Sequence, residues 1–539
     1  MGFKNLIKPR LDAPLPAWMI FPVVFTALYV SHFTLLRLPY YWDEAGYYIP
    51  AAWDFFRTGS LIPITTLTNA HPPLPSVYLA LWWKVSGFFP EVTREAVLCV
   101  AAFALVGVWR LALRLAGEPW VAFWTVVLTA VYPIWFAQST LAHADIFAAA
   151  CTLWGLAYAL PGSRREWHPK SWVAALWFAA AALSKETAIV IPLTLALVSV
   201  AEAWRTAGPA RGRLLREAAW LGSCALPLAG WYGYHRWKTG FLFGNPEFLR
   251  YNAQANLEPL RMLAAFGHRI LHLTAHMHMF VPVLMTIASL MLAVRTDGDG
   301  QPREGIGAAA LKRIFLLLLA NAVLFSVLGG ALLTRYLLPM YPLVLLVAVT
   351  TFYRRAPFWH GLALFSAAAF GVALFVNPPY RFAPEDNLAY ARVIRMHQAG
   401  IEELNKRYAG STVLSAWPVT DELSRPELGY LKQPYDVYRL EDFTAEQIGR
   451  AAQEPEKYSA ALVFSTKYDP PVLPLSLGPR SEAMDERYFG LHHDLPPETI
   501  AHQLGGALVW KSEQQGQWIA LIRFNRQFEA RLREPDRLR

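Results

Sequence analysis

Long runs of apolar residues, separated by short charged segments, occupy most of the chain as far as Val376. A helix that crosses a bilayer needs ~20 mostly apolar residues, so each run predicts one span whose ends extend into the flanking polar residues. The eleven predicted spans are Ala17–Leu36, Ala96–Leu113, Trp120–Ala137, Ile146–Leu160, Ser171–Leu183, Ala188–Val200, Ala218–Tyr234, Ala275–Val294, Ile314–Leu333, Leu337–Phe352 and Phe358–Val376. The pattern predicts a multi-span α-helical membrane protein.

A twelfth apolar run, His71–Pro90, decides the topology, because every later loop changes sides if this run crosses the membrane. Lys and Arg concentrate in cytoplasmic loops. If the run lies flat, the cytoplasmic loops receive Arg110, Arg114, Arg164, Arg165, Lys170, Arg205, Arg211, Arg213, Arg216, Arg295, Arg303, Lys312, Arg313, Arg354 and Arg355. We therefore expect interfacial helices in the first outer loop, residues 38–95, with the amino terminus cytoplasmic and the carboxyl terminus extracytoplasmic.

The composition changes at the Pro-rich segment Asn377–Asn387, beyond which apolar stretches are short and separated by charge. The pattern there predicts a helix at Leu388–Tyr408, strands at Thr412–Ala416 and Ala460–Phe464, and a hairpin formed by residues 507–513 and 517–524. We expect two parts: a transmembrane domain over residues 1–376 and a soluble extracytoplasmic α/β domain over residues 377–539.

The composition agrees with a membrane protein. Hydrophobic residues make up 55% of the chain and charged residues only 17%, with 21 Trp, 23 Tyr and 31 Phe. The formal charge of +9 is explained by Lys and Arg in cytoplasmic loops and predicts no nucleic-acid partner. The cysteines, Cys99, Cys151 and Cys224, lie far apart in apolar runs, so we expect neither a disulfide nor a zinc site. The basic start, Lys4, Lys8 and Arg10, precedes a span without a cleavage pattern, which predicts a retained signal anchor in the inner (plasma) membrane.

Charged and polar side chains gather on the predicted outer face. These residues are Asp43, Glu44, His71, Asp145, Lys185 and Arg335. Charges near hydrocarbon are costly unless they are paired or functional, so their convergence predicts a site. Simpler roles stay open for each: Asp43 and Asp145 as helix caps, Glu44 as a charge at a helix start, His71 as a structural residue beside two prolines, and Lys185 and Arg335 as interfacial anchors.

These residues resemble the motifs of the GT-C superfamily of polyprenyl-phosphate-sugar-dependent glycosyltransferases. The similar branch includes protein O-mannosyltransferases and the aminoarabinose transferases that modify lipid A. The matching elements, in the family's order, are Asp43-Glu44, His71-Pro72-Pro73-Leu74, Asp145, Leu183-Ser184-Lys185 and the run Arg335–Pro342. They span roughly the first 380 residues.

The resemblance implies a sugar donor on a polyprenyl monophosphate at the outer face, with a glycan, lipid or protein as the acceptor. It makes Asp43 the catalytic base and Asp145 an aid at the donor or acceptor. Lys185 and Arg335 would hold the carrier phosphate, and Glu44, His71 and Tyr336 would contact the substrates, with Glu44 equally able to support the base from behind. Two departures stand out. Ala70-His71 replaces the Glu-Lys of the aminoarabinose transferases, which leaves a divalent cation open, and Ala142-His143-Ala144 lacks an Arg often found there.

The required chemistry fits these residue types. A carboxylate can take the acceptor's proton while cations stabilise the leaving phosphate, which predicts an inverting transfer without a covalent intermediate. The sequence has no Gly-rich phosphate loop, so we expect no nucleotide.

Two rival functions are a transporter or flippase of a sugar-lipid and an inactive assembly subunit. The charges at the outer ends of spans and the long outer loops favour the enzyme. Other polar clusters have simpler explanations. The row His268, His272, His276 and His278 has helical spacing but no carboxylate near it in sequence, so a metal site is the less favoured interpretation. The clusters Asp421-Glu422 and His492-His493-Asp494 are interpreted as solvated surface.

Overall fold

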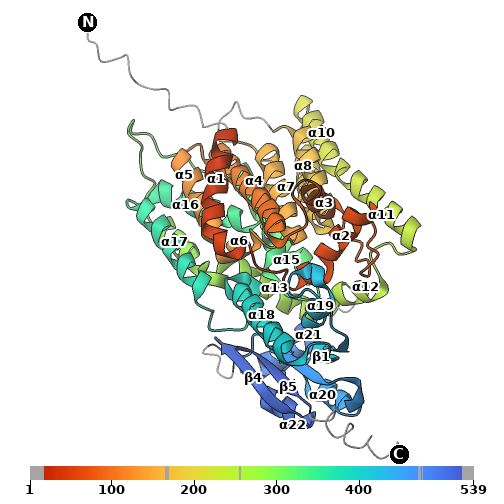
Figure 1. The fold of residues 1–539 in the computed structure, drawn as a ribbon. Coiled ribbons are helices and arrows are strands. Elements are labelled where there is room, and N and C mark those ends of the chain that lie inside the picture. Colours follow the sequence, from red (N-terminus) through yellow and green to blue (C-terminus); the bar gives the residue numbers. More distant parts are fainter. Residues whose placement is uncertain (1–16, 164–168, 254–255, 471–474, 476–477, 525–539) are drawn as a thin grey trace, which may run out of the picture.

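The computed structural model describes residues 17–163, 169–253, 256–470, 475 and 478–524. The predicted signal-anchor cations Lys4, Lys8 and Arg10 and the loop residues Arg164 and Arg165 lie outside these ranges. A helical part is followed by a smaller part that contains the β-sheet, and Figure 1 shows the two stacked end to end.

The helical part contains the helices α1 Ala17–His32, α2 Ile49–Thr58, α3 Leu74–Ser86, α4 Pro90–Ala116, α5 Pro119–Val131, α6 Pro133–Gln138, α7 Ala144–Ala159, α8 Ser171–Ser184, α9 Val190–Trp204, α10 Pro209–Ser223, α11 Ala225–Thr239, α12 Pro246–Asn252, α13 Pro259–Thr274, α14 Phe280–Leu290, α15 Ala308–Val327, α16 Tyr341–Arg355 and α17 Trp359–Phe375. Short turns between them, η3 Glu44–Tyr48, η4 Glu186–Ile189, η6 His276–His278, η7 Thr334–Leu337 and η8 Pro384–Asp386, carry many of the polar residues discussed below. Several helices begin with proline in the first turn, where its missing N–H costs no hydrogen bond.

Each predicted span falls on helix, but three of them are broken. Trp120–Ala137 divides into α5 and α6 at Tyr132, because Pro133 cannot continue the helix. Ala218–Tyr234 covers the junction of α10 and α11 at Cys224. Ala275–Val294 contains only the second half of a helix pair, α13 and α14, bent by 97° where Met277 and His278 have positive φ. The first half, α13, is an amphipathic helix that the sequence pattern did not reveal.

These breaks explain the lengths of the helices. Within the ranges given above, α4, α15 and the combined η4–α9 segment are long and apolar enough to cross a membrane alone, and the bent α13–α14 pair adds one more if it counts as a single span. Other helices, among them α5, α7, α8 and α17, are equally apolar but shorter than 18 residues. The helical membrane architecture is as predicted, whereas the count of eleven spans and the flat placement of α3 stay predictions.

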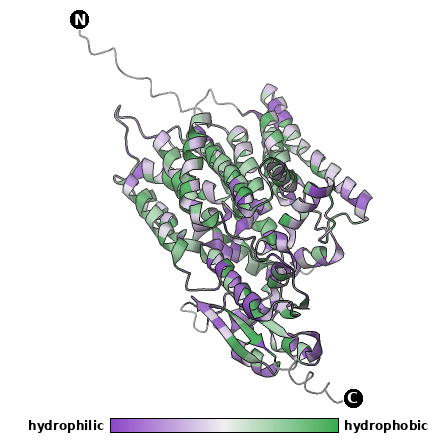
Figure 2. Ribbon diagram, viewed as in Figure 1, coloured by the Kyte–Doolittle hydropathy of each residue, from purple (hydrophilic) through white to green (hydrophobic). Residues whose placement is uncertain are grey.

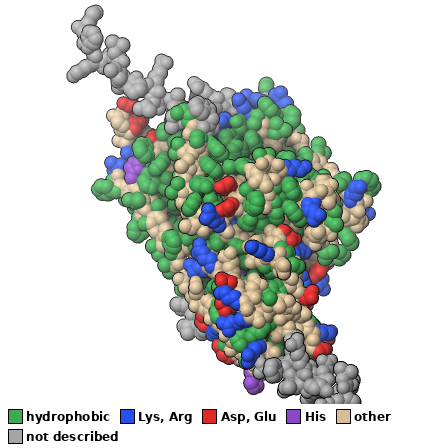
Figure 3. All heavy atoms as spheres, in the orientation of Figure 1, with side chains coloured by type: hydrophobic (Ala, Val, Ile, Leu, Met, Phe, Trp, Pro, Cys, Tyr) green, Lys and Arg blue, Asp and Glu red, His purple; other side chains and the backbone are tan. Residues whose placement is uncertain are grey.

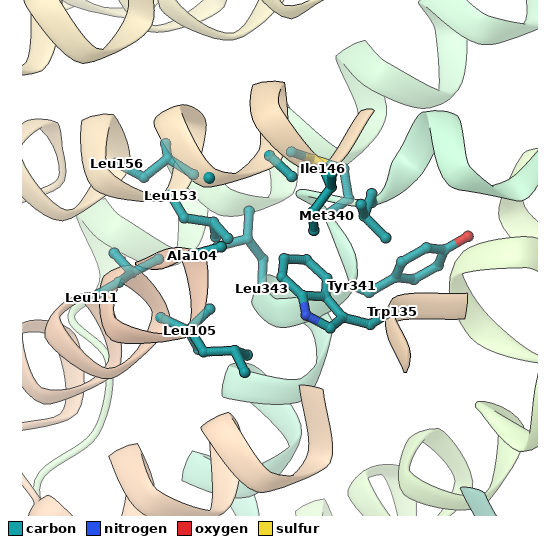
Figure 4. Close-up of a cluster of buried hydrophobic side chains, with 14 of the residues drawn as sticks. Ala104, Leu105, Leu111, Trp135, Ile146, Leu153, Leu156, Met340, Tyr341 and Leu343 are labelled. Atoms are coloured by element: carbon teal, nitrogen blue, oxygen red, sulfur yellow. The ribbon is translucent and has the colours of Figure 1, made fainter. Parts of the chain in front are cut away.

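The core of the helical part forms where α4, α5, α7, α8 and α16 pack together. Figure 4 shows side chains from α4, α7 and α16 meeting around Trp135, which is completely buried. Gly155 lets α7 and α8 approach closely, since a Cβ there would lie 2.6 Å from the ring of Phe178. This closely packed centre positions the ends of the helices that carry the charged residues.

The sheet part begins with α18 Ala389–Tyr408 and continues through β1 Val413–Ala416, α19 Val419–Ser424, β2 Val437–Leu440, α20 Ala445–Ala451, β3 Ala460–Phe464, α21 Pro479–Phe489, α22 Pro497–Gln503, β4 Ala507–Gln514 and β5 Gln517–Arg523. The described strands are ordered β2-β1-β3-β5-β4, with β1 parallel to β2 and β3, and β5 antiparallel to β3 and β4. Helix α18, both predicted strands and the hairpin form as the sequence indicates. Strand β2 was missed because its four residues, VYRL, carry too weak a pattern.

One prediction for this part is wrong. Glu422 is not solvated but completely buried, and both its oxygens contact Nδ1 of His397, at 3.1 and 2.9 Å. Asp421 is also buried and accepts a hydrogen bond from Arg439 at 3.1 Å. Asp494 caps the backbone of Phe443 and Thr466, whereas His493 is largely exposed as expected. The acids are buried because each meets a cationic or N–H partner from a distant segment, which sequence spacing cannot show.

The arginines of α10 and the sheet lie at opposite ends of the molecule. Figure 3 shows Lys and Arg side chains gathered over the end that α10 forms, where Arg211, Arg213 and Arg216 are exposed. Figure 2 shows mostly hydrophobic helices between that end and the sheet. The sheet part is fixed to the first loop by hydrogen bonds, from Tyr40 N to Leu428 O at 3.2 Å and from the Tyr430 hydroxyl to Tyr40 O at 3.0 Å.

Candidate functional site

Arg335, on the turn η7, is the centre of a buried group of charges. Its side chain is 3% exposed and contacts the carboxylates of Asp43 and Glu385, while its Nε lies 3.3 Å from Oδ2 of Asp145. Lys185 Nζ donates to Oδ1 of Asp145 at 2.5 Å. We call these five residues the charged cluster. Four of them, Asp43, Asp145, Lys185 and Arg335, were singled out from sequence.

Helix ends bring the charged cluster together. Asp43 precedes the turn η3, Asp145 lies in the first turn of α7, and Lys185 follows the last residue of α8. Asp43 makes no capping hydrogen bond to η3, although it stands at the capping position. Its contact with Arg335, 292 residues away in the chain, accounts for its position better than capping does.

Glu44 faces away from the charged cluster. It is completely buried, its oxygens accept hydrogen bonds from Arg94 at 2.9 and 3.0 Å, and it also caps the backbone N–H groups of Tyr41 and Ala142. Arg94, in the first half of α4, additionally donates to carbonyl oxygens of Leu38, Pro39 and Thr140. The sequence contained a signal for Arg94: an arginine at the start of an apolar helix needs a partner.

Removing Glu44 is expected to destabilise the protein. Truncating one partner of a buried ion pair leaves the other charge uncompensated, so Glu44→Ala should lower the free energy of unfolding by about 3–5 kcal/mol. The measurement is denaturation of the purified protein in detergent. Glu402→Ala, an exposed glutamate on α18, serves as the matched control and should change stability little. Equal losses for the two variants would contradict a structural role for the Glu44–Arg94 pair.

A cavity of about 1750 Å³ opens beside the charged cluster. Asp43, His71, Lys185, Arg335 and Tyr336 line it, as does Glu385, whereas Glu44 and Asp145 do not. Its wall on one side is apolar and is built by helices of the membrane part: Ile189, Val190, Leu228, Phe248, Leu249, Leu271, Leu324 and Leu328. The sheet part closes another side with residues 465–468 and Gln517. The cavity therefore combines a charged end, an apolar wall and a polar rim.

His71 and Tyr336 flank the charged end of the cavity. His71 Nδ1 lies 3.0 Å from the carboxylate of Glu186, and its ring packs between those of Tyr47 and Tyr48. The ammonium of Lys185 lies 4.1 Å from the centre of the Tyr336 ring, a cation–π contact. Both residues are within the site that the sequence predicted, and they shape its walls.

Glu385 and Asp386, on the turn η8, are the site residues that sequence reasoning missed. Glu385 contacts Arg335, and Asp386 accepts hydrogen bonds from Thr334 and from His276 Nε2, the latter at 2.9 Å. Burial raises the pKa of Glu385 from 4.5 to about 8, with Asp43, Asp386 and Asp145 adding to the rise and Arg335 opposing it. A signal was present: the pair follows the last predicted span as Asp43-Glu44 follows the first.

The histidines and carboxylates around the cavity are not arranged as the ligands of a metal ion in the described residues. Among the described residues, no three His, Cys, Asp or Glu side chains are placed to share one. His268, His272 and His276 do form a row on the cavity wall, with neighbouring ring centres 6.3 and 5.4 Å apart, but His276 is already bound by Asp386 and Tyr380. The carboxylates nearest Arg335 are likewise occupied by cationic side chains.

Comparisons with known proteins agree with this architecture. A family model described as dolichyl-phosphate-mannose-protein mannosyltransferase matches residues 70–228. A search of curated protein sequences gives no match. ArnT from Cupriavidus metallidurans in the apo state aligns over 94% of this chain and 98% of its own, with 14% identity and a TM-score of 0.50. The same protein bound to undecaprenyl phosphate aligns with the same coverage, 15% identity and a TM-score of 0.51. The S. cerevisiae Pmt1–Pmt2 protein O-mannosyltransferase complex bound to its sugar donor aligns over 46% of this chain and 37% of its own, with 13% identity and a TM-score of 0.33.

The resemblance drawn from the motifs is thus confirmed at the level of fold. The ArnT alignments extend over nearly the whole of both chains, and the family match, residues 70–228, includes His71, Asp145 and Lys185. The chain is a multi-pass membrane protein with the fold of ArnT, and its residues 70–228 match the dolichyl-phosphate-mannose-protein mannosyltransferase family model.

Proposed function

We propose that the protein transfers a sugar from a polyprenyl-phosphate donor to a glycan, lipid or protein acceptor on the extracytoplasmic face of the membrane. The observation that carries this proposal is the cavity itself. Its charged end holds cations suited to a phosphate, and the adjoining wall is apolar and belongs to membrane helices, as an isoprenoid tail requires. A soluble nucleotide sugar would have no use for that wall.

The reaction needs a base beside a phosphate site. Asp43 is the base, since its side chain is 34% exposed and lines the cavity while Asp145 and Glu385 are buried. As the acceptor hydroxyl oxygen bonds to the anomeric carbon, its proton passes to Asp43 and the bond from that carbon to the phosphate oxygen breaks. Attack from the face opposite the phosphate inverts the anomeric centre.

The cations act on the leaving phosphate. Arg335 offers a planar fork and Lys185 a point charge, and both are fixed before the reaction because Asp145 holds each of them. Asp145 is therefore a positioning residue that aims the two cations. Tyr336, beneath the Lys185 ammonium, and His71, between two tyrosines, form the surfaces against which the sugar and carrier pack.

Reconstitution tests the activity directly. Purified protein in liposomes that contain a polyprenyl-phosphate sugar and candidate acceptors should release polyprenyl phosphate and yield a glycosylated product, followed by mass spectrometry. Movement of the sugar-lipid across the bilayer without product would establish the flippase alternative. Neither movement nor product, with donors and acceptors that support a known enzyme of this fold, would favour an inactive assembly subunit.

The exposed arginines of α10 support a proposed orientation of the protein in the membrane. These arginines lie at the end opposite the sheet (Figure 1). We therefore propose that this end faces the cytoplasm and that residues 377–539 lie outside the cell's inner (plasma) membrane, which the helical part spans. In a variant without the native cysteines, Gln453→Cys, exposed in the sheet part, should react with an impermeant thiol reagent added to intact cells. Ala207→Cys, in the loop between α9 and α10, should react only after the cells are permeabilised. The reverse pattern would overturn the topology.

A further inference from the structure

The turn η8 is fixed against the turn η7, residue by residue. Glu385 contacts Arg335, and the next residue, Asp386, accepts a hydrogen bond from Thr334. Asn387 anchors the turn, since its side chain donates to the carbonyl of Ala373 at 3.2 Å and accepts from the N–H of Ala389 at 2.8 Å. Glu385 is thus held in place against the guanidinium by both α17 and α18.

The contacts of Arg335 divide between its terminal nitrogens. Both oxygens of Glu385 face Nη1, whereas Asp43 faces Nη2. A phosphate bound at Nη1 in place of the Glu385 carboxyl would lie beside the base on the same guanidinium. Arg335, Asp43 and Glu385 all line the cavity, so a ligand can reach this position.

The charge of the cluster depends on Glu385. With Asp43, Asp145 and Glu385 all ionised against Arg335 and Lys185, the charged cluster carries one excess negative charge, which repels a phosphate. The other groups that face Glu385 are Asp386, the hydroxyl of Tyr41 and the imidazole of His143, whose Nδ1 lies 4.0 Å away. Burial raises the pKa of Glu385 to about 8, so Glu385 keeps its proton at neutral pH. The negative and positive charges of the charged cluster are then equal in number.

We propose that Glu385 is a positioning residue that competes with the carrier phosphate for Arg335. When the carboxyl of Glu385 is neutral, the phosphate displaces it from Nη1 of Arg335. When Glu385 is ionised, its carboxylate stays bound to Nη1 and excludes the phosphate. When Glu385 ionises, its proton passes to water in the cavity. This inference rests on the proposed function, because it takes the ligand of Arg335 to be the phosphate of a lipid carrier.

The test is binding of undecaprenyl phosphate alone to the full-length protein in nanodiscs. If only the protein with neutral Glu385 binds, the fraction of competent protein falls above the pKa of Glu385, so affinity should weaken about tenfold between about pH 7 and about pH 9. Glu385→Gln cannot ionise, so the loss of affinity at alkaline pH should disappear in this variant. Any pH dependence that remains would come from the ionisation of the phosphate itself. Glu385→Asp should retain a pH dependence, and Glu402→Gln should follow the wild type.

Three outcomes would overturn the inference: no binding at any pH, a wild-type affinity that stays level from neutral to alkaline pH, or a Glu385→Gln variant that keeps the wild-type pH dependence. A pH-dependent affinity in a protein that shows no sugar transfer would instead support the role of Glu385 while refuting the proposed function. The wild-type titration needs no variant to fold, so the inference can fail on that measurement alone.

Discussion

Replacing Asp43 with Asn is expected to abolish sugar transfer. The amide keeps the size of the side chain but cannot accept the acceptor's proton, and general-base catalysis contributes about 10²–10⁴-fold to the rate. The product formed per unit time from a polyprenyl-phosphate sugar in liposomes measures the effect. Undecaprenyl phosphate should still bind to the variant, since Arg335 and Lys185 are retained.

The matched control is Asp299→Asn, an exposed aspartate in the loop between α14 and α15, which should transfer sugar at the wild-type rate. Asp43→Glu separates position from chemistry, because it keeps a base but moves the carboxylate. We expect it to be slow yet measurable. Unchanged transfer by Asp43→Asn would remove Asp43 from the mechanism and leave the carboxylates that line the cavity, Glu385 foremost, as the alternatives.

Replacing Arg335 should affect both stability and activity. Arg335→Leu leaves the buried carboxylate of Asp145 without a guanidinium, and breaking a buried ion pair costs about 3–5 kcal/mol of unfolding free energy. Arg335→Lys restores one positive charge but no planar fork, so it should recover part of the stability while transfer stays low. Thermal unfolding in detergent and transfer in liposomes measure the two effects separately.

An exposed arginine gives the comparison for these variants. Arg407→Lys on α18, where Glu403 is the partner at the surface, should match the wild type in both measurements. If Arg335→Lys transferred sugar at the wild-type rate, the fork geometry would be irrelevant and the phosphate would have to be held by Lys185 alone.

The sequence predicted the structure well where a single property of the residues, such as hydrophobicity, determines it. Apolar runs located the helices because hydrocarbon tolerates little else. Cations gave a topology, with the arginines of α10 in the cytoplasm, that stays a prediction. The 97° bend between α13 and α14 could not be predicted, because the positive φ values of Met277 and His278 have no glycine to mark them.

The same limit applies to the candidate site. Asp43, Asp145, Lys185 and Arg335 were found from their positions at helix ends, but their pairing depends on packing between segments up to 292 residues apart. Glu44 and Asp43 are adjacent in sequence and yet face opposite sides, since the turn η3 directs one to Arg94 and the other to Arg335. Glu385 was overlooked because its segment was interpreted only as a boundary between domains.

The buried pair of Glu44 and Arg94 also bears on how the chain enters the membrane. In the proposed orientation, Glu44 is synthesised before α4 and its carboxylate lies on the outer face when α4 is inserted. Arg94 must then follow it, against the general retention of cations on the cytoplasmic side. The carboxylate of Glu44, already on the outer face, offsets the cost of moving Arg94 there and favours the correct orientation of α4. Loss of Glu44 would therefore increase the share of chains inserted the wrong way round, a defect of biogenesis that precedes any defect of catalysis.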